Sequence, residues 1–337
     1  MRSSLRCLGA ALLSAGLSPW PAQAEGLHIG APQYESAVMG AEAERLRRSG
    51  HLEAVVRALN AQLRLPQRVT VRLIECGESN AYYDPGSREI QMCLELMEDM
   101  ATVLDGQFEE ASVEEDALSG AWLGTLLHEL GHALVDVLEL PITGREEDVV
   151  DQLSAWMLIQ SGDADAVLGY AATYYSEDRE ADASEFAGVH ALNEQRYYNL
   201  LCWAYGSDPE AGAELTQSWL LPEDRAALCE DEYAQMDRAW SRLLRDHLKQ
   251  PIAQLRMPRP NASGILFGDE DSPVLATGAE ATEAPSKDSV TRVGGIADRT
   301  APQAPATLGR IEKIRSGSPV EREADLRRPI NHRDERD

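Results

Sequence analysis

Two histidines and a glutamate stand close together in an apolar part of this 337-residue chain, at a spacing that suits metal chemistry. They form the pattern H-E-L-G-H at 128–132, inside a leucine- and alanine-rich stretch that predicts a helix over 121–139. Residues four apart lie on one face of a helix, so His128 and His132 can offer two imidazole nitrogens to one divalent cation. Glu129, turned by about 100° from His128, can reach a water on that cation. Because burying these side chains without a partner is costly, we expect one zinc ion per chain.

A catalytic zinc site needs a third protein ligand, with water in the fourth position. Glu147 is the predicted ligand, because it begins the helix that follows the motif helix. Glu146 is the rival, although it also completes a capping box over 143–146 that would give it a structural role. Asp151, one helical turn beyond Glu147, is predicted to accept a hydrogen bond from the outer nitrogen of a ligating histidine.

Helices are expected to dominate the elements that position these residues. A strand at 69–74 and a hairpin at 81–93, turning through Asp-Pro-Gly, are the predicted sheet. Gly131 weakens a helix, and we expect its bare backbone to let a neighbouring strand or the metal come close. The segment 106–115 is predicted to be an acidic loop, and Pro141 ends the motif helix near Leu140. Hydrophobic spacing predicts further helices over 35–64 with a break at Gly50, 94–104, 143–159, 163–176, 182–205 and 222–249.

The two ends of the chain differ in composition from its middle. Residues 1–24 have a basic start, a short apolar run and an Ala-Gln-Ala site, which predicts a cleaved secretory signal peptide. Residues 25–257 are the predicted folded domain, and 258–337 are predicted to be a disordered tail rich in Pro, Ala, Gly and Ser. We therefore expect an exported protein, periplasmic or secreted, with no membrane insertion after cleavage. A formal net charge of −26 argues against nucleic acid as a partner. The oligomeric state is left open.

Four cysteines remain after the predicted cleavage: Cys76, Cys93, Cys202 and Cys229. They allow three pairings, and none of them falls in a C-x-x-C pair that would indicate a cysteine zinc site. Pairing in sequence order closes short loops between elements that we expect to lie side by side. In an exported chain, two such disulfides are the expected state, and free thiols are the alternative.

The H-E-x-x-H motif followed by Glu147-x-x-x-Asp151 resembles the gluzincin zinc metallopeptidases. The stretches CGESNAYYDPGSREIQMCLEL, LLHELGHALVDVLELPITGREEDVVDQLSAWML, HALNEQRYYNLLCWAYG and CEDEYAQMDRAWSRLL more closely resemble a bacterial metallopeptidase family catalogued only as a domain of unknown function. The resemblance covers about residues 30–250 and implies an α+β, mainly helical, zincin-like fold. Such a fold packs a small edge-stranded sheet or hairpin on an active-site helix, with a helical C-terminal half.

The resemblance also implies hydrolysis of a peptide or protein substrate. Zinc would lower the pKa of its bound water, and Glu129 would take the proton as general base and pass it to the leaving amine. The resulting oxyanion needs a hydrogen-bond donor, and His190, on the helix expected over 182–205, is the predicted catalytic donor. The other candidates, for which packing is the simpler role, are Tyr82, Tyr83, Tyr197 and Tyr198.

Two other functions fit parts of the pattern. The E-x-x-H at 129–132 is also typical of di-iron carboxylate bundles, but the second such motif, at 25–28, stands at the new N-terminus and not in a helix. A non-catalytic zinc-binding interaction or scaffold module of the same fold is the alternative function. In that case Glu129→Gln would leave the biological role intact.

Overall fold

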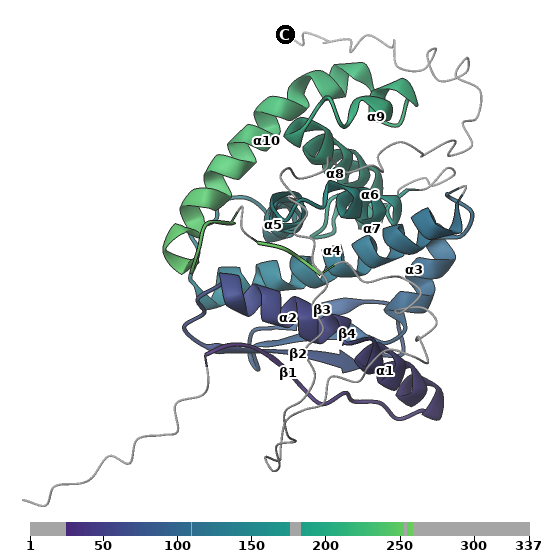
Figure 1. Ribbon diagram of the computed structural model, residues 1–337, viewed down its shortest axis with the longest axis vertical. Helices are drawn as coiled ribbons and strands as arrows, with labels where there is room; N and C mark the ends of the chain where they lie inside the picture. Colours follow the sequence, from purple (N-terminus) through teal and green to yellow (C-terminus); the bar gives the residue numbers. More distant parts are fainter. Residues whose placement is uncertain (1–24, 109, 176–182, 253–254, 259–337) are drawn as a thin grey trace, which may run out of the picture.

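Four short strands form one sheet in the computed structural model, which describes residues 25–108, 110–175, 183–252 and 255–258 (Figure 1). The strand order is β1-β2-β4-β3. β1 (Gly26–Ile29), β2 (Arg68–Ile74) and β4 (Glu89–Cys93) run parallel, whereas β3 (Ala81–Asp84) is antiparallel to β4. The strand at 69–74 and the hairpin are confirmed, while β1 was not expected from the sequence. β3 lies at one edge of the sheet, next to the motif helix.

Two helices lie between β1 and β2 in the sequence, and they agree with the expected break at Gly50. α1 (Ala37–Ser49) ends and α2 (His51–Gln62) begins at this glycine, whose φ of +64° suits a residue without a side chain. The apolar face of α2 is buried in the core and includes Val55 and Leu59. The short helix expected at 94–104 is α3 (Leu96–Leu104).

The motif helix, α4 (Ala111–Val137), crosses the molecule between the sheet and the C-terminal helices (Figure 1). The prediction of a loop over 106–115 was therefore wrong from Ala111 onward. The residues from Ala111 to Ser119 include neither glycine nor proline, so nothing in this acidic segment prevents the helix from starting early. The helix ends close to the predicted position before Pro141.

The C-terminal half consists of helices, as expected, but with different boundaries. The helix expected over 182–205 is divided, and His190 lies in the loop between its two parts instead of on a helix. A short helix at 213–217 was not expected. The elements are α5 (Glu146–Gln160), α6 (Ala164–Ala172), α7 (Ala183–Phe186), α8 (Asn193–Ser207), α9 (Ala213–Gln217), α10 (Glu223–Leu243) and a 3-10 turn, η1 (Arg245–His247).

Small residues on α4 allow its neighbours to approach closely. A Cβ atom added to Gly131 would lie 2.7 Å from Cβ of Val150 on α5, and one added to Gly120 would lie 2.7 Å from Cα of Ala166 on α6. Both distances are too short for real atoms. The expectation that the bare backbone of Gly131 admits a neighbour is met by a helix, not by a strand or the metal. This contact places the first turns of α5 against the H-E-x-x-H motif.

The capping box predicted over 143–146 is not formed. The N-cap of α5 is Arg145, which makes no side-chain capping bond, and its guanidinium pairs with Asp148. Glu146 instead directs its carboxylate to Nδ1 of His132, at 2.8 Å. Glu146 thus binds His132 across the α4–α5 interface and not the backbone N–H at residue 143. The sequence spacing that predicts a capping box takes no account of a partner on another helix.

Both disulfides join cysteines in sequence order, as predicted: Cys76 to Cys93 and Cys202 to Cys229. Disulfides form and persist in oxidising compartments. Among the described residues, no helix combines the length and the apolar composition that crossing a membrane requires. The fold class is confirmed as α+β and mainly helical, and the predicted leader and nearly all of the predicted tail lie outside the described residues.

Candidate metal centre

A cleft of about 820 Å³ opens along α4, between the edge strand β3 and the helices of the C-terminal half. Both motif histidines and Glu129 line it. Its other walls come from β3, α3, α5, α6 and α8, from further residues of α4, and from the loops before β3 and α8. They include Ser79, Asn80, Ala81, Tyr82, Tyr83, Met100, Val103, Thr125, Asp136, Glu147, Tyr170, Tyr174, His190 and Arg196.

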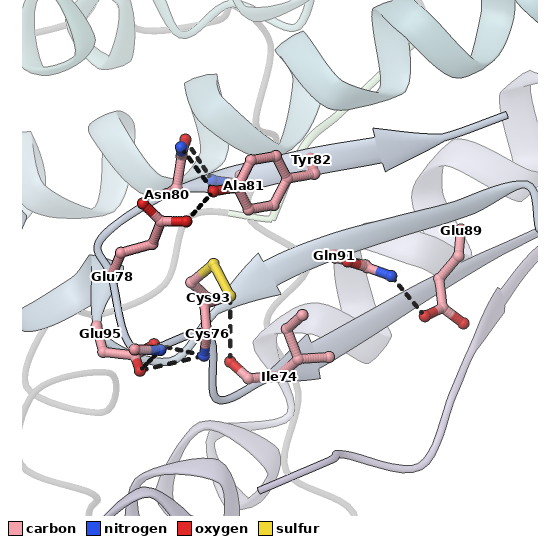
Figure 2. Close-up of a disulfide and its surroundings, with 11 residues drawn as sticks. Ile74, Cys76, Glu78, Asn80, Ala81, Tyr82, Glu89, Gln91, Cys93 and Glu95 are labelled. Carbon is pink, nitrogen blue, oxygen red and sulfur yellow. Dashed lines mark hydrogen bonds between the residues drawn. A yellow bond between two sulfur atoms is a disulfide. The ribbon is translucent and has the colours of Figure 1, made fainter.

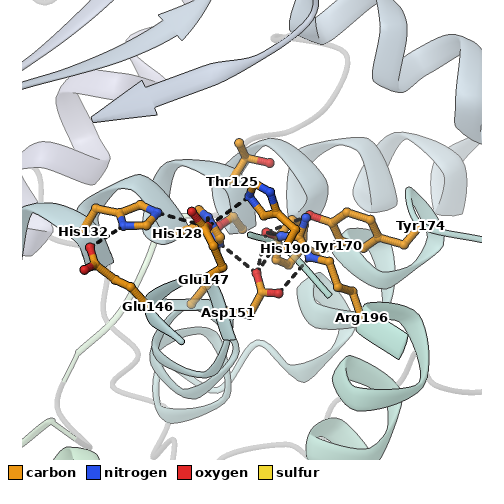
Figure 3. Close-up of polar contacts among 12 residues, drawn as sticks. Thr125, His128, His132, Glu146, Glu147, Asp151, Tyr170, Tyr174, His190 and Arg196 are labelled. Carbon is orange, nitrogen blue, oxygen red and sulfur yellow. Dashed lines mark hydrogen bonds and ion pairs between the residues drawn. The ribbon is translucent and has the colours of Figure 1, made fainter. Parts of the chain in front are cut away.

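The two motif histidines direct their Nε2 atoms to the same carboxylate oxygen (Figure 3). Nε2 of His128 lies 3.2 Å from Oε2 of Glu147, and Nε2 of His132 lies 3.3 Å from that oxygen. Glu146 contacts the opposite nitrogen, Nδ1, of His132. Of the two neighbouring glutamates, Glu147 is therefore the one that meets the Nε2 atoms.

A third imidazole reaches the same oxygen from outside the motif. Nε2 of His190 lies 3.0 Å from Oε2 of Glu147 (Figure 3), although His190 is in the loop before α8 and its side chain is half exposed. The ligand atoms of His128, Glu147 and His190 all lie within 4.8 Å of one another. The structure thus brings His190 to Glu147 and the motif histidines, but from a loop and not from a helix.

The donor types suit a divalent metal ion such as zinc. Imidazole nitrogen and carboxylate oxygen are ligands that zinc accepts at about 2.0–2.2 Å, and in a tetrahedral shell such atoms lie about 3.3–3.4 Å apart. The separations of 3.2 and 3.3 Å between Glu147 and the motif histidines are close to that value. The group whose ligand atoms all lie within 4.8 Å of one another consists of His128, Glu147 and His190.

Asp151 holds the outer nitrogen of His128, as its position one turn beyond Glu147 predicts. Its Oδ1 lies 2.8 Å from Nδ1 of His128, and both residues are buried. Arg196 on α8 donates two hydrogen bonds to the Asp151 carboxylate, at 2.7 and 2.8 Å, and stacks on the ring of Tyr174 (Figure 3). The hydroxyl of Tyr170 lies 3.3 Å from Oδ1 of Asp151. The orientation of His128 is therefore fixed by a buried network.

Sequence reasoning missed Arg196 and Tyr170 as members of this network. One signal was available for Arg196, because it stands on the same helical face as Leu200 and Trp203, both buried. A cation on an apolar helical face indicates a buried anionic partner. Tyr170 gave no comparable signal, since a tyrosine in an apolar helix is typical of ordinary core packing.

The carboxyl groups of the site differ in their electrostatic surroundings. Burial raises the pKa of Glu147, but hydrogen bonds from His128, His132 and His190 lower it more, to well below its usual range. Burial likewise raises the pKa of Asp151, and the charge of Arg196 with the His128 hydrogen bond lowers it further than burial raises it. Burial raises the pKa of Glu129, only partly offset by the histidines. Glu129 is thus the carboxylate of the site that most readily accepts a proton.

The tyrosines proposed as oxyanion donors fall into two groups. Tyr82 and Tyr83 on β3 line the cleft, where the Tyr83 hydroxyl donates to Asp136 at 2.6 Å and that of Tyr82 donates to Glu78 at 2.6 Å. Tyr197 and Tyr198 do not line it; their rings pack against each other on α8. The cleft instead contains Tyr174, whose pKa burial raises to about 12.

Comparison with known proteins identifies a family but no individual relative. Residues 33–244, more than half of the chain, match the model of a family described as "Putative metallopeptidase". The chain belongs to this family, which confirms the resemblance found in the sequence. Searches of curated proteins and of solved structures found no match.

Proposed function

We propose that this protein is an exported zinc-dependent peptidase, periplasmic or secreted, in which His128, His132 and Glu147 hold the metal. The observation that carries the proposal is the convergence of imidazole Nε2 atoms on one Glu147 oxygen inside an open cleft. Membership of a metallopeptidase family supports a metal and a peptide or protein substrate. The apolar leader in the sequence and the two disulfides support export.

Each side chain has a distinct task in the proposed reaction. When bound, zinc would polarise the substrate carbonyl and lower the pKa of a water molecule. Glu129 accepts the proton of the attacking water and passes it to the leaving amine, a role that suits a carboxyl group whose pKa is raised by burial. His190, half exposed at the cleft, donates a hydrogen bond to the developing oxyanion. Asp151 and Arg196 keep the His128 ring in place.

The edge strand supplies a binding surface for an extended peptide. β3 is an end strand of the sheet and pairs with β4 on one side, while its residues Ala81, Tyr82 and Tyr83 line the cleft. The backbone groups on the unpaired side of such a strand can pair with a peptide by strand addition. A bound peptide would then lie along α4, with its carbonyl groups close to Glu129 and His190.

The direct test is cleavage of a peptide library by the zinc-loaded protein and by Glu129→Gln, with products identified by mass spectrometry. Wild type should cleave, and Glu129→Gln should lose at least about 100-fold in kcat while retaining its zinc. His190→Ala should retain zinc and lose roughly 100-fold in kcat. Zinc binding with no cleavage by wild type would favour the alternative, a non-catalytic zinc-binding interaction module.

A further inference from the structure

One wall of the cleft is a single continuous stretch of chain. Residues 79–83, which lead into and form most of β3, all line the cleft. β3 has four residues and pairs with β4 through the register Ala81 to Met92 and Asp84 to Glu89. A shift of one residue in a strand exchanges its two faces. The usefulness of this wall for peptide binding therefore depends on what keeps its register.

A disulfide fixes the N-terminal side of the wall (Figure 2). Cys76 follows β2, and its partner Cys93 is the last residue of β4, the strand with which β3 pairs. The backbone N–H of Cys93 donates to the carbonyl of Asn80 at 3.2 Å. The chain from Cys76 to Asn80 is thus held at both ends by one residue, Cys93.

The carboxylate of Glu95 holds the same segment from below the end of β4 (Figure 2). It accepts hydrogen bonds from the backbone N–H groups of Cys76, at 3.1 and 3.2 Å, and of Gly77, at 2.7 Å. Gly77 has a φ of +75°, a conformation that favours glycine, so the turn at this position requires this residue type. Together the disulfide and Glu95 brace the loop that delivers residues 79–83 to the cleft.

We propose that the Cys76–Cys93 disulfide and Glu95 are positioning groups for peptide binding in the cleft. This inference rests on the proposed peptidase function and deepens it. Neither group is among the residues that line the cleft; both act through the loop 76–80 and the register of β3. Without them, the wall samples more conformations, and a peptide that pairs with β3 must order the wall as it binds.

The test uses the full chain with Glu129→Gln, so that a bound peptide is not cleaved. The probe is a ten-residue peptide that wild type cleaves, and its Kd is measured by calorimetry with zinc present. Adding Cys76→Ala and Cys93→Ala should raise the Kd about tenfold and leave the zinc content at one per chain. Amide hydrogen exchange should become faster at residues 76–83.

The second disulfide provides a matched control. Cys202 on α8 and Cys229 on α10 do not line the cleft, and their replacement by alanine should destabilise the fold yet leave the Kd unchanged. Glu95→Gln keeps the Cys76–Cys93 bond and should raise the Kd a few-fold, which preserves the test if the double alanine variant does not fold.

Three results would overturn the inference. One is an unchanged Kd in both Glu95→Gln and the Cys76/Cys93 double alanine variant. If the double alanine variant does not fold, an unchanged Kd in Glu95→Gln is sufficient. Another is an equal rise in the Cys202/Cys229 control, which would indicate general destabilisation. A wild type that cleaves no peptide would remove the proposed function, and the inference with it, whatever the exchange data show.

Discussion

Asp151 connects the motif helix to α8 at the level of single side chains. It lies between Nδ1 of His128 and the guanidinium of Arg196, and it is almost fully buried. An isolated buried carboxylate would be costly, but here a cation and hydrogen bonds offset that cost. The low pKa of Asp151 follows from these partners and keeps it charged at neutral pH. This charge orients the ring of His128 toward Glu147.

Replacement of Asp151 by asparagine should therefore weaken zinc binding by roughly 10–100-fold, because the His128 ring loses its charged partner. It should also destabilise the fold by about 3–5 kcal/mol, since Arg196 is left buried without a counter-charge. Zinc affinity is measured by competition with a chelator, and stability by urea unfolding. Asp148→Asn, on the same helix but paired with Arg145 at the surface, is the matched control and should change neither. Equal zinc affinity in Asp151→Asn and wild type would contradict this role.

His51 is another buried ionisable residue, and it does not line the cleft. Its side chain packs against Trp122, its Nε2 atom has no hydrogen-bond partner among the described residues, and burial lowers its pKa to about 4. The pKa in the folded state is below that of the unfolded chain, near 6.5, so folding favours the neutral ring. The stability that this provides is complete above pH 6.5 and is lost as the pH falls from 6.5 toward 4.

The zinc-free protein should accordingly lose about 3 kcal/mol of unfolding free energy between pH 7 and pH 4 through His51 alone. His51→Phe keeps a ring against Trp122 but cannot take up a proton. Its loss of unfolding free energy between pH 7 and pH 4 should therefore be smaller than that of wild type by about 3 kcal/mol. Urea unfolding at several pH values gives both curves, and their difference isolates His51 because the other groups are common to both proteins. Parallel curves would show that His51 does not titrate between these limits.

Single residues of the site were predictable where one motif contains them. The H-E-x-x-H spacing, together with Glu147 and Asp151, predicts a cluster that the structure does bring together. Arg196 was not predicted because its partner is 45 residues away, and the pairing exists only after α8 packs on α5. His190 was predicted as a site residue, but its position in a loop was not predicted.

Helix contacts explain how the site is assembled at the level of elements. α4 supplies the two histidines, and α5 supplies Glu147 and Asp151. The close approach of the two helices at Gly131 and Val150 sets the distance between the histidines and these two carboxylates. Glu147 and Asp151 flank Val150 on α5, so any separation of the helices at this point moves both carboxylates away from the histidines.

Gly131→Ala should therefore affect both stability and metal binding. The added methyl group would overlap with Cβ and Cγ1 of Val150 and force α5 outward, at a cost of about 1–3 kcal/mol. Zinc affinity should fall at least about tenfold, because Glu147 moves with α5. Gly120→Ala is the control, since it meets Ala166 on α6 and should destabilise the fold without weakening zinc binding. An equal fall in zinc affinity in both variants would show that the loss does not arise from the α4–α5 contact.

Most elements were predictable from local pattern, and the errors occur where tertiary contacts decide. Hydrophobic spacing predicted α1, α2 and α3, and the Asp-Pro-Gly turn predicted the hairpin. The capping box failed because Glu146 pairs across an interface with His132. β1 was missed because its four residues join the sheet only by pairing in parallel with β2. The paired residues, such as Gly26 and Arg68, are 42 positions apart in the sequence.

The whole molecule combines an oxidised scaffold with an open cleft. Each disulfide joins elements on one side of the cleft, Cys76–Cys93 at the sheet and Cys202–Cys229 between α8 and α10. Bonds of this kind suggest an oxidising compartment. At this scale the sequence predicts disulfide pairing and fold class, but not the shape of the cleft, which depends on how β3, α3 and α6 pack around α4.

The central claim is that this cleft holds one metal ion through two histidines and Glu147. The most direct measurement is the zinc content of the purified full chain, compared with that of Glu147→Ala and Glu146→Ala. One zinc per chain in wild type and Glu146→Ala, with a large loss in Glu147→Ala, is the result predicted by the contacts of Glu147 with both Nε2 atoms. Full retention in Glu147→Ala would place the third ligand elsewhere, and a wild type that binds no zinc after loading would contradict the account as a whole.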